Sequence, residues 1–278
     1  MLSSVFSGMR LIDVHCHLMH EQFKDDADEV ITRAKKAGVT AILVSGTTPE
    51  ANKEALTLAR KYPLVKASLG IYPIDALGLQ PEGADGMPRH NGPIDLEEQF
   101  SFIEKHLSEV AAVGEVGMDF YWAEKEKTFQ QQAENFRKII RFCLRIKKPI
   151  IIHSRKAEEE CLDILEQEIP AQEIPVIQHC FSGRKGLMTR AIQLGHYFSI
   201  PPNIVRASNF ETLVHKAPIE QILTETDAPW LSPFLGKRNE PAFVLESVKK
   251  IAEVKKISVE EAAEKIWENY NLIFGKEK

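Results

Sequence analysis

The chain has 278 residues, of which 44% are hydrophobic, and its formal net charge at pH 7 is -5. This length and apolar content suit one large domain or two small ones with a sizeable core. The negative charge excludes a general attraction to nucleic acid, so an anionic substrate needs a local basic patch. No apolar stretch approaches the length of a membrane span, and residues 1–10 lack the charged-then-apolar pattern of a signal peptide.

Cysteine usage indicates a reduced compartment. The four cysteines, Cys16, Cys143, Cys161 and Cys180, form no CxxC pair. This pattern is more typical of a cytoplasmic protein than of a secreted disulfide scaffold.

Short apolar runs alternate with amphipathic helical patterns along the whole chain. The predicted strands are residues 11–17, 40–46, 66–70, 110–117, 149–153, 175–180, 196–200 and 222–227. Helical patterns lie between them, for example at 26–37, 49–61, 96–107, 126–147 and 157–167, and residues 242–274 predict two further helices. Eight strands that alternate with helices favour an α/β fold, a (β/α)8 TIM barrel, as a single domain over residues 1–278. A doubly wound open sheet is the main alternative, but the chain has no GxGxxG or phosphate-loop signature.

Residues 74–93 are rich in Gly and Pro and show little periodicity. They predict a long loop after the third strand, on the active face of a barrel, where it would act as a lid. A disordered insertion is the alternative. His90 within this segment would either fold back over the site or stay in solvent.

The first predicted strand ends in two histidines spaced two residues apart. Residues i and i+2 of a strand point to the same face, so His15 and His17 share one face and Cys16 points to the other. Two imidazoles held on a rigid strand are half of a metal site.

Other predicted strands end in metal-ligating residues as well. In a TIM barrel the active site forms where the strands end, at their C-terminal face. The side chains predicted to meet there are His15, His17, Glu115, His153, His179 and Asp227.

Imidazole and carboxylate together suit Zn, Mn, Mg or Fe as divalent ions. Six ligands exceed the needs of one tetrahedral ion, so we expect two ions per chain. Glu115 offers two anionic oxygens and suits a bridging ligand. Asp227 suits a ligand that also accepts a proton from the attacking water. Two ions could together stabilise both the attacking and the leaving oxygen of a phosphodiester.

Three further side chains near these strand ends have structural interpretations. Strand alternation predicts that Cys16 and Cys180 face the helix layer as apolar packing residues. Glu225 shares the face of Asp227 one layer deeper, so it either orients a histidine or serves the barrel core.

Basic residues follow several predicted strands, where they would form an anion-binding rim on the active face. They are Arg155, Lys156, Arg184, Lys185, Arg206, Lys237 and Arg238. The alternative is that they are ordinary surface residues, because Lys147 and Lys148 fall at the opposite end of the barrel.

These residues lie in motifs that resemble the TatD-type metal-dependent deoxyribonucleases of the amidohydrolase superfamily. The matching segments are DVHCH at 13–17, GEVGMDF at 114–120, IHSR at 152–155, HCFSG at 179–183, ETDAPW at 225–230 and RNEP at 238–241. They occur in the family's order and span nearly the whole chain.

The resemblance implies a barrel that hydrolyses DNA phosphodiester bonds with metal ions held by the six residues above, Glu115 and Asp227 being catalytic. The activity would be that of a 3′-5′ exonuclease or a repair-type nuclease, on single-stranded DNA or DNA ends. Asp119 and Arg238 resemble substrate-side or supporting positions of the family. We also expect substrate contacts from Tyr72, Arg155, Arg184 and Arg206. Nothing in the sequence indicates an obligate protein partner.

One departure from the family pattern bears on substrate. Many relatives have Gly-x-His-Pro after strand three, whereas this chain has Tyr72 at the histidine position. A tyrosine can donate to a phosphate oxygen or stack on a base, but it cannot replace a protonated imidazole. A small-substrate hydrolase for a phosphotriester, lactone or amide is therefore the first alternative. A non-catalytic metal-binding scaffold is the second.

Overall fold

The structure, a computed structural model, describes residues 8–79, 86–169 and 173–275. Eight parallel strands form one sheet in the order β1-β2-β3-β4-β5-β6-β7-β8. Their bounds are β1 Leu11–Cys16, β2 Val39–Ser45, β3 Val65–Leu69, β4 Val110–Gly117, β5 Ile150–His153, β6 Val176–His179, β7 Tyr197–Ile200 and β8 Ile222–Thr224. This sequential order confirms the TIM barrel and excludes the doubly wound sheet, in which the strand order reverses.

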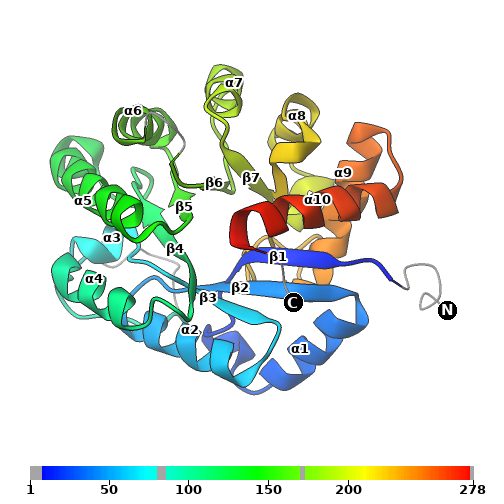
Figure 1. The fold of residues 1–278 in the computed structure, drawn as a ribbon, viewed down its shortest axis with the longest axis horizontal. Coiled ribbons are helices and arrows are strands. Elements are labelled where there is room, and N and C mark those ends of the chain that lie inside the picture. The colour runs from blue at the N-terminus through cyan, green and yellow to red at the C-terminus, as the bar shows by residue number, and fades with distance from the viewer. Residues whose placement is uncertain (1–7, 80–85, 170–172, 276–278) are drawn as a thin grey trace.

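Helices surround the sheet on its outer side (Figure 1). Their bounds are α1 Ala27–Lys36, α2 Pro49–Lys61, α3 Pro73–Ala76, α4 Leu96–Lys105, α5 Lys125–Ile146, α6 Glu158–Glu168, α7 Lys185–Gln193, α8 Ser208–Lys216, α9 Val244–Lys255 and α10 Val259–Phe274. The strands are buried on both faces, as their Val- and Ile-rich sequences require. None of the helices in the described part of the chain is long and apolar enough to cross a bilayer.

The contact between the first and last strands is made largely by side chains. Thr224 Oγ1 donates to the Ile12 carbonyl at 2.6 Å. The buried carboxylate of Asp13 accepts hydrogen bonds from Thr226 N at 2.9 Å and Thr226 Oγ1 at 2.5 Å. These bonds hold the segment after β8 against the C-terminal end of β1, which is where the predicted metal-ligating residues lie.

The predicted strand at 222–227 is too long. β8 ends at Thr224, and Glu225 to Asp227 continue as irregular backbone in which Asp227 has a φ of 55°. The left-handed conformation at Asp227 ends regular pairing.

The predicted loop at 74–93 is anchored over the barrel mouth in its described parts. Thr48 Oγ1 donates to the Pro88 carbonyl at 2.9 Å, and Glu21 N donates to Gly86 O at 2.8 Å. Residues 80–85 of this segment lie outside the described residues. His90 is turned to Glu50, with its Nδ1 3.2 Å from a carboxylate oxygen, and lines neither cavity, so of the two positions considered it does not take the one over the site.

Candidate metal centre and active site

His15 and His17 present their Nε2 atoms side by side, 3.1 Å apart, in the interior of the barrel mouth. The Nδ1 of His17 lies 2.9 Å from the Ser45 carbonyl oxygen, which can only accept a hydrogen bond. Nδ1 therefore carries the proton, and the lone pair of the neutral ring is on Nε2. Ser45 Oγ lies 3.1 Å from His15 Nδ1 and orients that ring in the same way. Both rings thus turn a ligating nitrogen to the same point.

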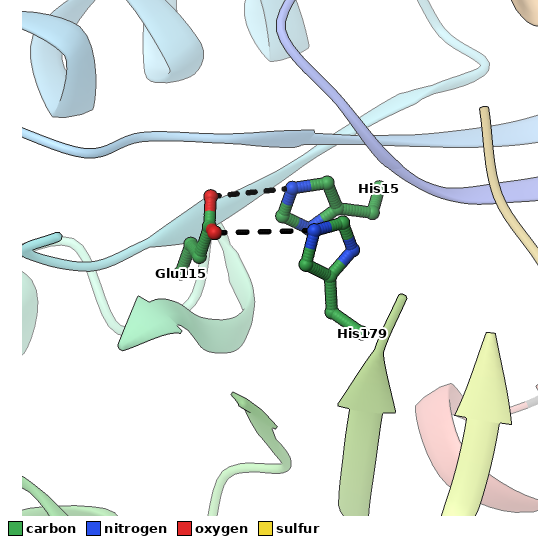
Figure 2. Close-up of side chains that lie close together, drawn as sticks. All are labelled: His15, Glu115 and His179. Atoms are coloured by element: carbon green, nitrogen blue, oxygen red, sulfur yellow. Dashed lines mark ion pairs between the residues drawn. The ribbon is translucent and has the colours of Figure 1, made fainter. Parts of the chain in front are cut away.

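The carboxylate of Glu115, on β4, faces two imidazoles at once (Figure 2). Its Oε2 lies 3.4 Å from His15 Nε2, and its Oε1 lies 3.9 Å from His179 Nε2. Burial alone would raise the pKa of Glu115, but hydrogen bonds and charge from His15 and His153 hold that pKa well below the usual value. Glu115 is therefore a buried anion with each oxygen directed at a different histidine.

Asp227 completes the cluster from the segment after β8. Its Oδ1 lies 3.3 Å from His17 Nε2, 3.6 Å from His15 Nε2 and 4.0 Å from His179 Nε2. Its backbone N–H donates to the His15 carbonyl at 2.8 Å, which ties it to β1. Burial acts to raise the pKa of Asp227, but the surrounding imidazoles lower it below the ordinary value. Asp227 is therefore ionised at neutral pH.

His153, at the end of β5, lies between two carboxylates. Its Nδ1 is 2.7 Å from Glu115 Oε1, and its Nε2 is 2.8 Å from Asp119 Oδ2. Burial lowers the pKa of His153, but the two carboxylates outweigh it and raise that pKa to about 9. Tyr72 Oη donates to the same Asp119 oxygen at 2.7 Å. Asp119 thus anchors both His153 and Tyr72.

Gly117 lets β4 and β5 approach closely enough for Glu115 and His153 to meet. Its φ is +142°, and a Cβ added there would lie 2.0 Å from the His153 carbonyl oxygen. An L side chain at this position would push the two strands apart.

Glu225 is fully buried and holds His179 from behind. Its Oε2 lies 2.7 Å from His179 Nδ1 and accepts a hydrogen bond from Ser199 Oγ, while its Oε1 accepts from Cys180 N at 3.0 Å. Burial acts to lower the pKa of His179, but the charge of Glu225 raises it to about 10. Of the two roles considered for Glu225, the structure favours the orientation of a histidine.

The donors of this cluster fit divalent metal ions. Two groups of buried or half-buried side chains, His15 with Glu115 and His179, and His15 with His17 and Asp227, each bring three ligand atoms within 4.8 Å of one another. Because the two groups together present five imidazole and carboxylate side chains, more than one tetrahedral ion needs, the cluster suits a binuclear centre. All six predicted residues lie in it, since His153 joins through Glu115. Their individual roles as ligands stay a prediction.

The two cysteines near the cluster differ from each other. Cys16 is buried, and its Sγ donates to the Leu43 carbonyl at 3.6 Å, as a packing residue. The same prediction is wrong for Cys180, whose Sγ lies 2.9 Å from Glu225 Oε1 and close to His179 and Asp227. Its φ of 44° breaks the strand alternation on which the prediction rested. Burial and Glu225 raise the pKa of this thiol well above the usual value, so the sulfur stays protonated.

A cavity of about 300 Å³ opens above the cluster. Besides cluster residues it is lined by Thr47, Thr48, Tyr72, Asp75, Met87, Pro88, Arg89, Trp122, Arg155, Trp230 and Leu231. A second cavity of about 290 Å³ shares with it His153, Arg155, His179, Asp227 and Leu231. The cluster therefore lies where the two cavities meet.

The predicted basic rim is only partly at the cavities. Arg155 lines both cavities and lies over the Tyr121 ring at 3.7 Å. The other three arginines proposed as substrate contacts line neither cavity. Arg184 pairs with Glu159, Arg206 donates to the Pro233 carbonyl, and Arg238 pairs with Asp26.

The other two proposed contacts also differ in position. Tyr72 lines the larger cavity, whereas Asp119 is fully buried behind His153 and lines neither one. Asp119 can therefore act on a substrate only through the side chains that it holds.

Sequence reasoning assigned no individual role to several of the residues that line the larger cavity, among them Asp75, Arg89, Trp122 and Trp230. Asp75 and Arg89 belong to the segment predicted as a loop at 74–93, where no periodicity indicates the direction of a side chain; its first residues, Asp75 among them, instead form the short helix α3. Trp230 lies in the ETDAPW motif, which was the one available signal.

Comparisons with known proteins agree with this site. Residues 12–275 match the family described as TatD related DNase. The chain is 34% identical to human deoxyribonuclease TATDN3 over 97% of this chain and 96% of that protein. It is also 34% identical to the uncharacterized metal-dependent hydrolase YabD of Bacillus subtilis over 95% of this chain and 98% of the relative.

A solved structure shows the same fold. The crystal structure of YJJV, a TatD homologue from Escherichia coli k12, superposes with a TM-score of 0.82 at 26% identity, covering 96% of this chain and 98% of the other. The chain therefore belongs to the TatD related DNase family of metal-dependent hydrolases, within the amidohydrolase superfamily.

Proposed function

We propose that this protein is a metal-dependent deoxyribonuclease that cleaves phosphodiester bonds at the ends of DNA or in single strands. The observation that carries the proposal is the position of Glu115 between His15 and His179, with His17 and Asp227 beside it, at the floor of a cavity. Relatives of nearly the same length carry the name deoxyribonuclease, which supports DNA as the substrate.

We propose that the residues of the cluster would hold two ions. One would be held by His15, His17 and Asp227, and the other by His153 and His179, with Glu115 contributing to both. Divalent ions bound there would supply positive charge to the phosphate oxygens and acidify a water molecule. The hydrogen bonds that His179 donates to Glu225 and His17 donates to the Ser45 carbonyl hold the two rings in place before any ion or substrate arrives.

Asp227 is the residue that we propose accepts the proton of the attacking water. It is ionised, its side chain is 16% exposed, and it lines both cavities. The other carboxylate of the cluster, Glu115, is engaged with His153 at 2.7 Å and is only 6% exposed. Asp227 is therefore the better placed of the two to receive a proton.

The size and walls of the cavity support an end or an extruded nucleotide as the substrate. About 300 Å³ is at the lower limit of small-molecule sites, so the cavity accommodates about one nucleotide and no duplex. Trp122 and Trp230 provide apolar aromatic surface on which a base can stack. Arg155 offers a guanidinium for a phosphate. These features suit a 3′-5′ exonuclease or a repair-type nuclease.

The proposal is tested with two charge reversals in the metal-loaded full chain. Arg155→Glu places a negative charge in both cavities, whereas Arg184→Glu changes an exposed residue that pairs with Glu159. We expect Arg155→Glu to lower turnover of a labelled single-stranded oligonucleotide by about tenfold or more and Arg184→Glu to leave it nearly unchanged. Equal effects of the two variants would contradict the proposed substrate path.

Two further measurements separate the alternative functions. Turnover of small esters and lactones that exceeds DNA turnover, and that Arg155→Glu leaves unchanged, would favour the small-substrate hydrolase. DNA cleavage that persists in Asp227→Asn would point to a contaminating nuclease.

All four cysteines are free thiols, which supports our proposal of a cytoplasmic location.

A further inference from the structure

Asp75 is a buried acid on the wall of the larger cavity. It lies in α3, directly after β3, and only 7% of the residue is exposed. Within the described part of the chain, its carboxylate makes no hydrogen bond to another residue and no ion pair. The metal cluster and the proposed reaction do not use it. Apart from a hydrogen bond with its own backbone N–H, the carboxylate is left to pair with a molecule in the cavity that it lines.

The surroundings of Asp75 leave it ionised at neutral pH. Burial raises its pKa to about 6, and the nearby negative charge of Glu115 also acts to raise it. Arg89 and His90 act against this rise without a hydrogen bond or ion pair to the carboxylate. We propose that the cavity binds part of an anionic polymer. Burying an anion such as Asp75 against that ligand costs free energy unless the ligand supplies hydrogen-bond donors.

The wall that carries Asp75 is held in place from several directions. Thr48 caps α2 through Ala51 N and donates to the Pro88 carbonyl, which joins α2 to the segment that contains Arg89. Tyr72, the residue before α3, donates to the buried Asp119. Asp75 is therefore presented to the cavity by anchored segments, as a specificity residue must be.

We propose that Asp75 selects the base of the bound nucleotide and that it favours guanine. This inference rests on the proposed function, because it takes the cavity to hold the nucleotide next to the scissile bond. The two oxygens of a carboxylate accept hydrogen bonds only. Guanine presents two adjacent donors, N1–H and the N2 amino group, which match both oxygens. Trp122 and Trp230, which line the same cavity, provide the stacking surface.

The other three bases match Asp75 less well. Adenine and cytosine each place one amino donor next to a ring nitrogen that accepts, so the second carboxylate oxygen would face an acceptor. Thymine has one N3–H between two carbonyl oxygens. Because an unmatched buried acceptor loses a charge-assisted hydrogen bond, the expected discrimination is about tenfold or more in affinity.

The test measures binding and does not depend on cleavage. The four 2′-deoxynucleoside 5′-monophosphates are titrated into the Mn²⁺-loaded full chain by isothermal titration calorimetry. We expect dGMP to bind at least about tenfold more tightly than dTMP, and Asp75→Asn to remove most of this difference because the amide replaces one acceptor by a donor. Glu50→Gln is the matched control, since it neutralises a carboxylate that contacts His90 in the same loop but does not line the cavity.

Each outcome bears on the proposal. The proposal is supported if Glu50→Gln keeps the guanine preference and Asp75→Asn loses it while the melting temperature of Asp75→Asn stays that of the wild type. Equal binding of all four nucleotides by the wild type, together with DNA cleavage, overturns the role of Asp75 and leaves the nuclease standing. A guanine preference that survives in Asp75→Asn also overturns it. Absence of both nucleotide binding and DNA cleavage would defeat the proposed function itself.

Discussion

The Nδ1 atom of His179 lies 2.7 Å from Oε2 of Glu225, and this contact directs the opposite nitrogen of the ring to Glu115. Glu225 is fully buried and also accepts hydrogen bonds from Ser199 and from the backbone of Cys180. Ser199 and the backbone of Cys180 therefore fix the position of the Glu225 carboxylate, and this carboxylate in turn fixes the orientation of the His179 ring.

Replacement of Glu225 should weaken metal binding without removing any proposed ligand. Glu225→Ala leaves His179 free to rotate, so we expect the affinity for Mn²⁺ or Zn²⁺ to fall by about 10–100-fold. Glu158→Gln is the control, because Glu158 contacts the nearby Ser182 on the surface. A competition titration with a metal-sensitive dye measures both variants. Unchanged affinity in Glu225→Ala would show that the contact does not orient the ligand.

Metal removal should lower the stability of the folded chain. An ion that binds only the native state at 100 times its Kd adds about 2.7 kcal/mol, which corresponds to about 5–10 °C in Tm for a chain of this size. We expect a chelator to lower the Tm by this amount in the wild type and by much less in the double variant His15→Ala/His17→Ala. His90→Gln, which alters a histidine paired with Glu50 outside the cluster, should retain the full shift. Calorimetry with and without chelator makes the comparison.

The close approach of β4 and β5 at Gly117 should tolerate no side chain. Gly117→Ala places a methyl group 2.0 Å from the His153 carbonyl oxygen at a φ of +142°. We expect it to lower the free energy of unfolding by about 1–3 kcal/mol or more, and to weaken metal binding. Gly186→Ala is the matched control, since Gly186 lies in α7 with no atom within 4 Å of the added Cβ, and it should gain up to about 1 kcal/mol. Urea unfolding measures the free energy of unfolding of both variants. Equal values for Gly117→Ala and Gly186→Ala would refute the steric argument.

The contribution of His196 to the stability of the metal-free chain should be lost in mild acid. This residue is 5% exposed, and its Nδ1 lies 3.0 Å from Gln178 Nε2, which can only donate. Burial, and then the charge of Arg190, lower the pKa of His196 to about 4. An unfolded histidine titrates near 6.5, so the unfolded chain binds more protons between these pH values. This contribution to stability is present above pH ~6.5 and is lost as the pH falls toward 4.

The loss can be assigned to His196 by substitution. Between pH 7 and pH 4.5 this contribution of His196 amounts to about 2–3 kcal/mol, so the change in the free energy of unfolding should differ between the wild type and His196→Gln by that amount. His215→Gln, a change at an exposed histidine of α8, should behave as the wild type. Urea unfolding in the presence of a chelator keeps metal release out of the comparison. Identical pH dependence in all three chains would exclude His196 as the cause.

Local sequence patterns were sufficient to predict the barrel and the directions of the side chains on its strands. Strand alternation places His15 and His17 on one face, and the sequence order of the strands is also their order in the sheet. Glu115, His153 and His179 were likewise found because each lies within or at the end of a buried apolar run. The physical reason is that hydrogen bonding and burial fix the direction of a strand residue from its neighbours alone.

Beyond the strand ends, local pattern no longer determines where a side chain points. Asp227 reaches His17 only because Asp13 and Thr226 hold the segment after β8 against β1, and Cys180 turns toward Glu225 at a positive φ. Arg155 lines both cavities while Arg184, which also follows a strand, pairs with Glu159 on the surface.

The amino-acid sequence by itself thus determined the family, the barrel and the identities of the candidate ligands. The tertiary structure decided which loop residues share the cavity with them, among them Asp75 and Arg89. Loop backbone is held by contacts with distant segments, such as the bonds of Thr48 to Pro88 and of Glu21 to Gly86, and those partners cannot be recognised until the chain has folded.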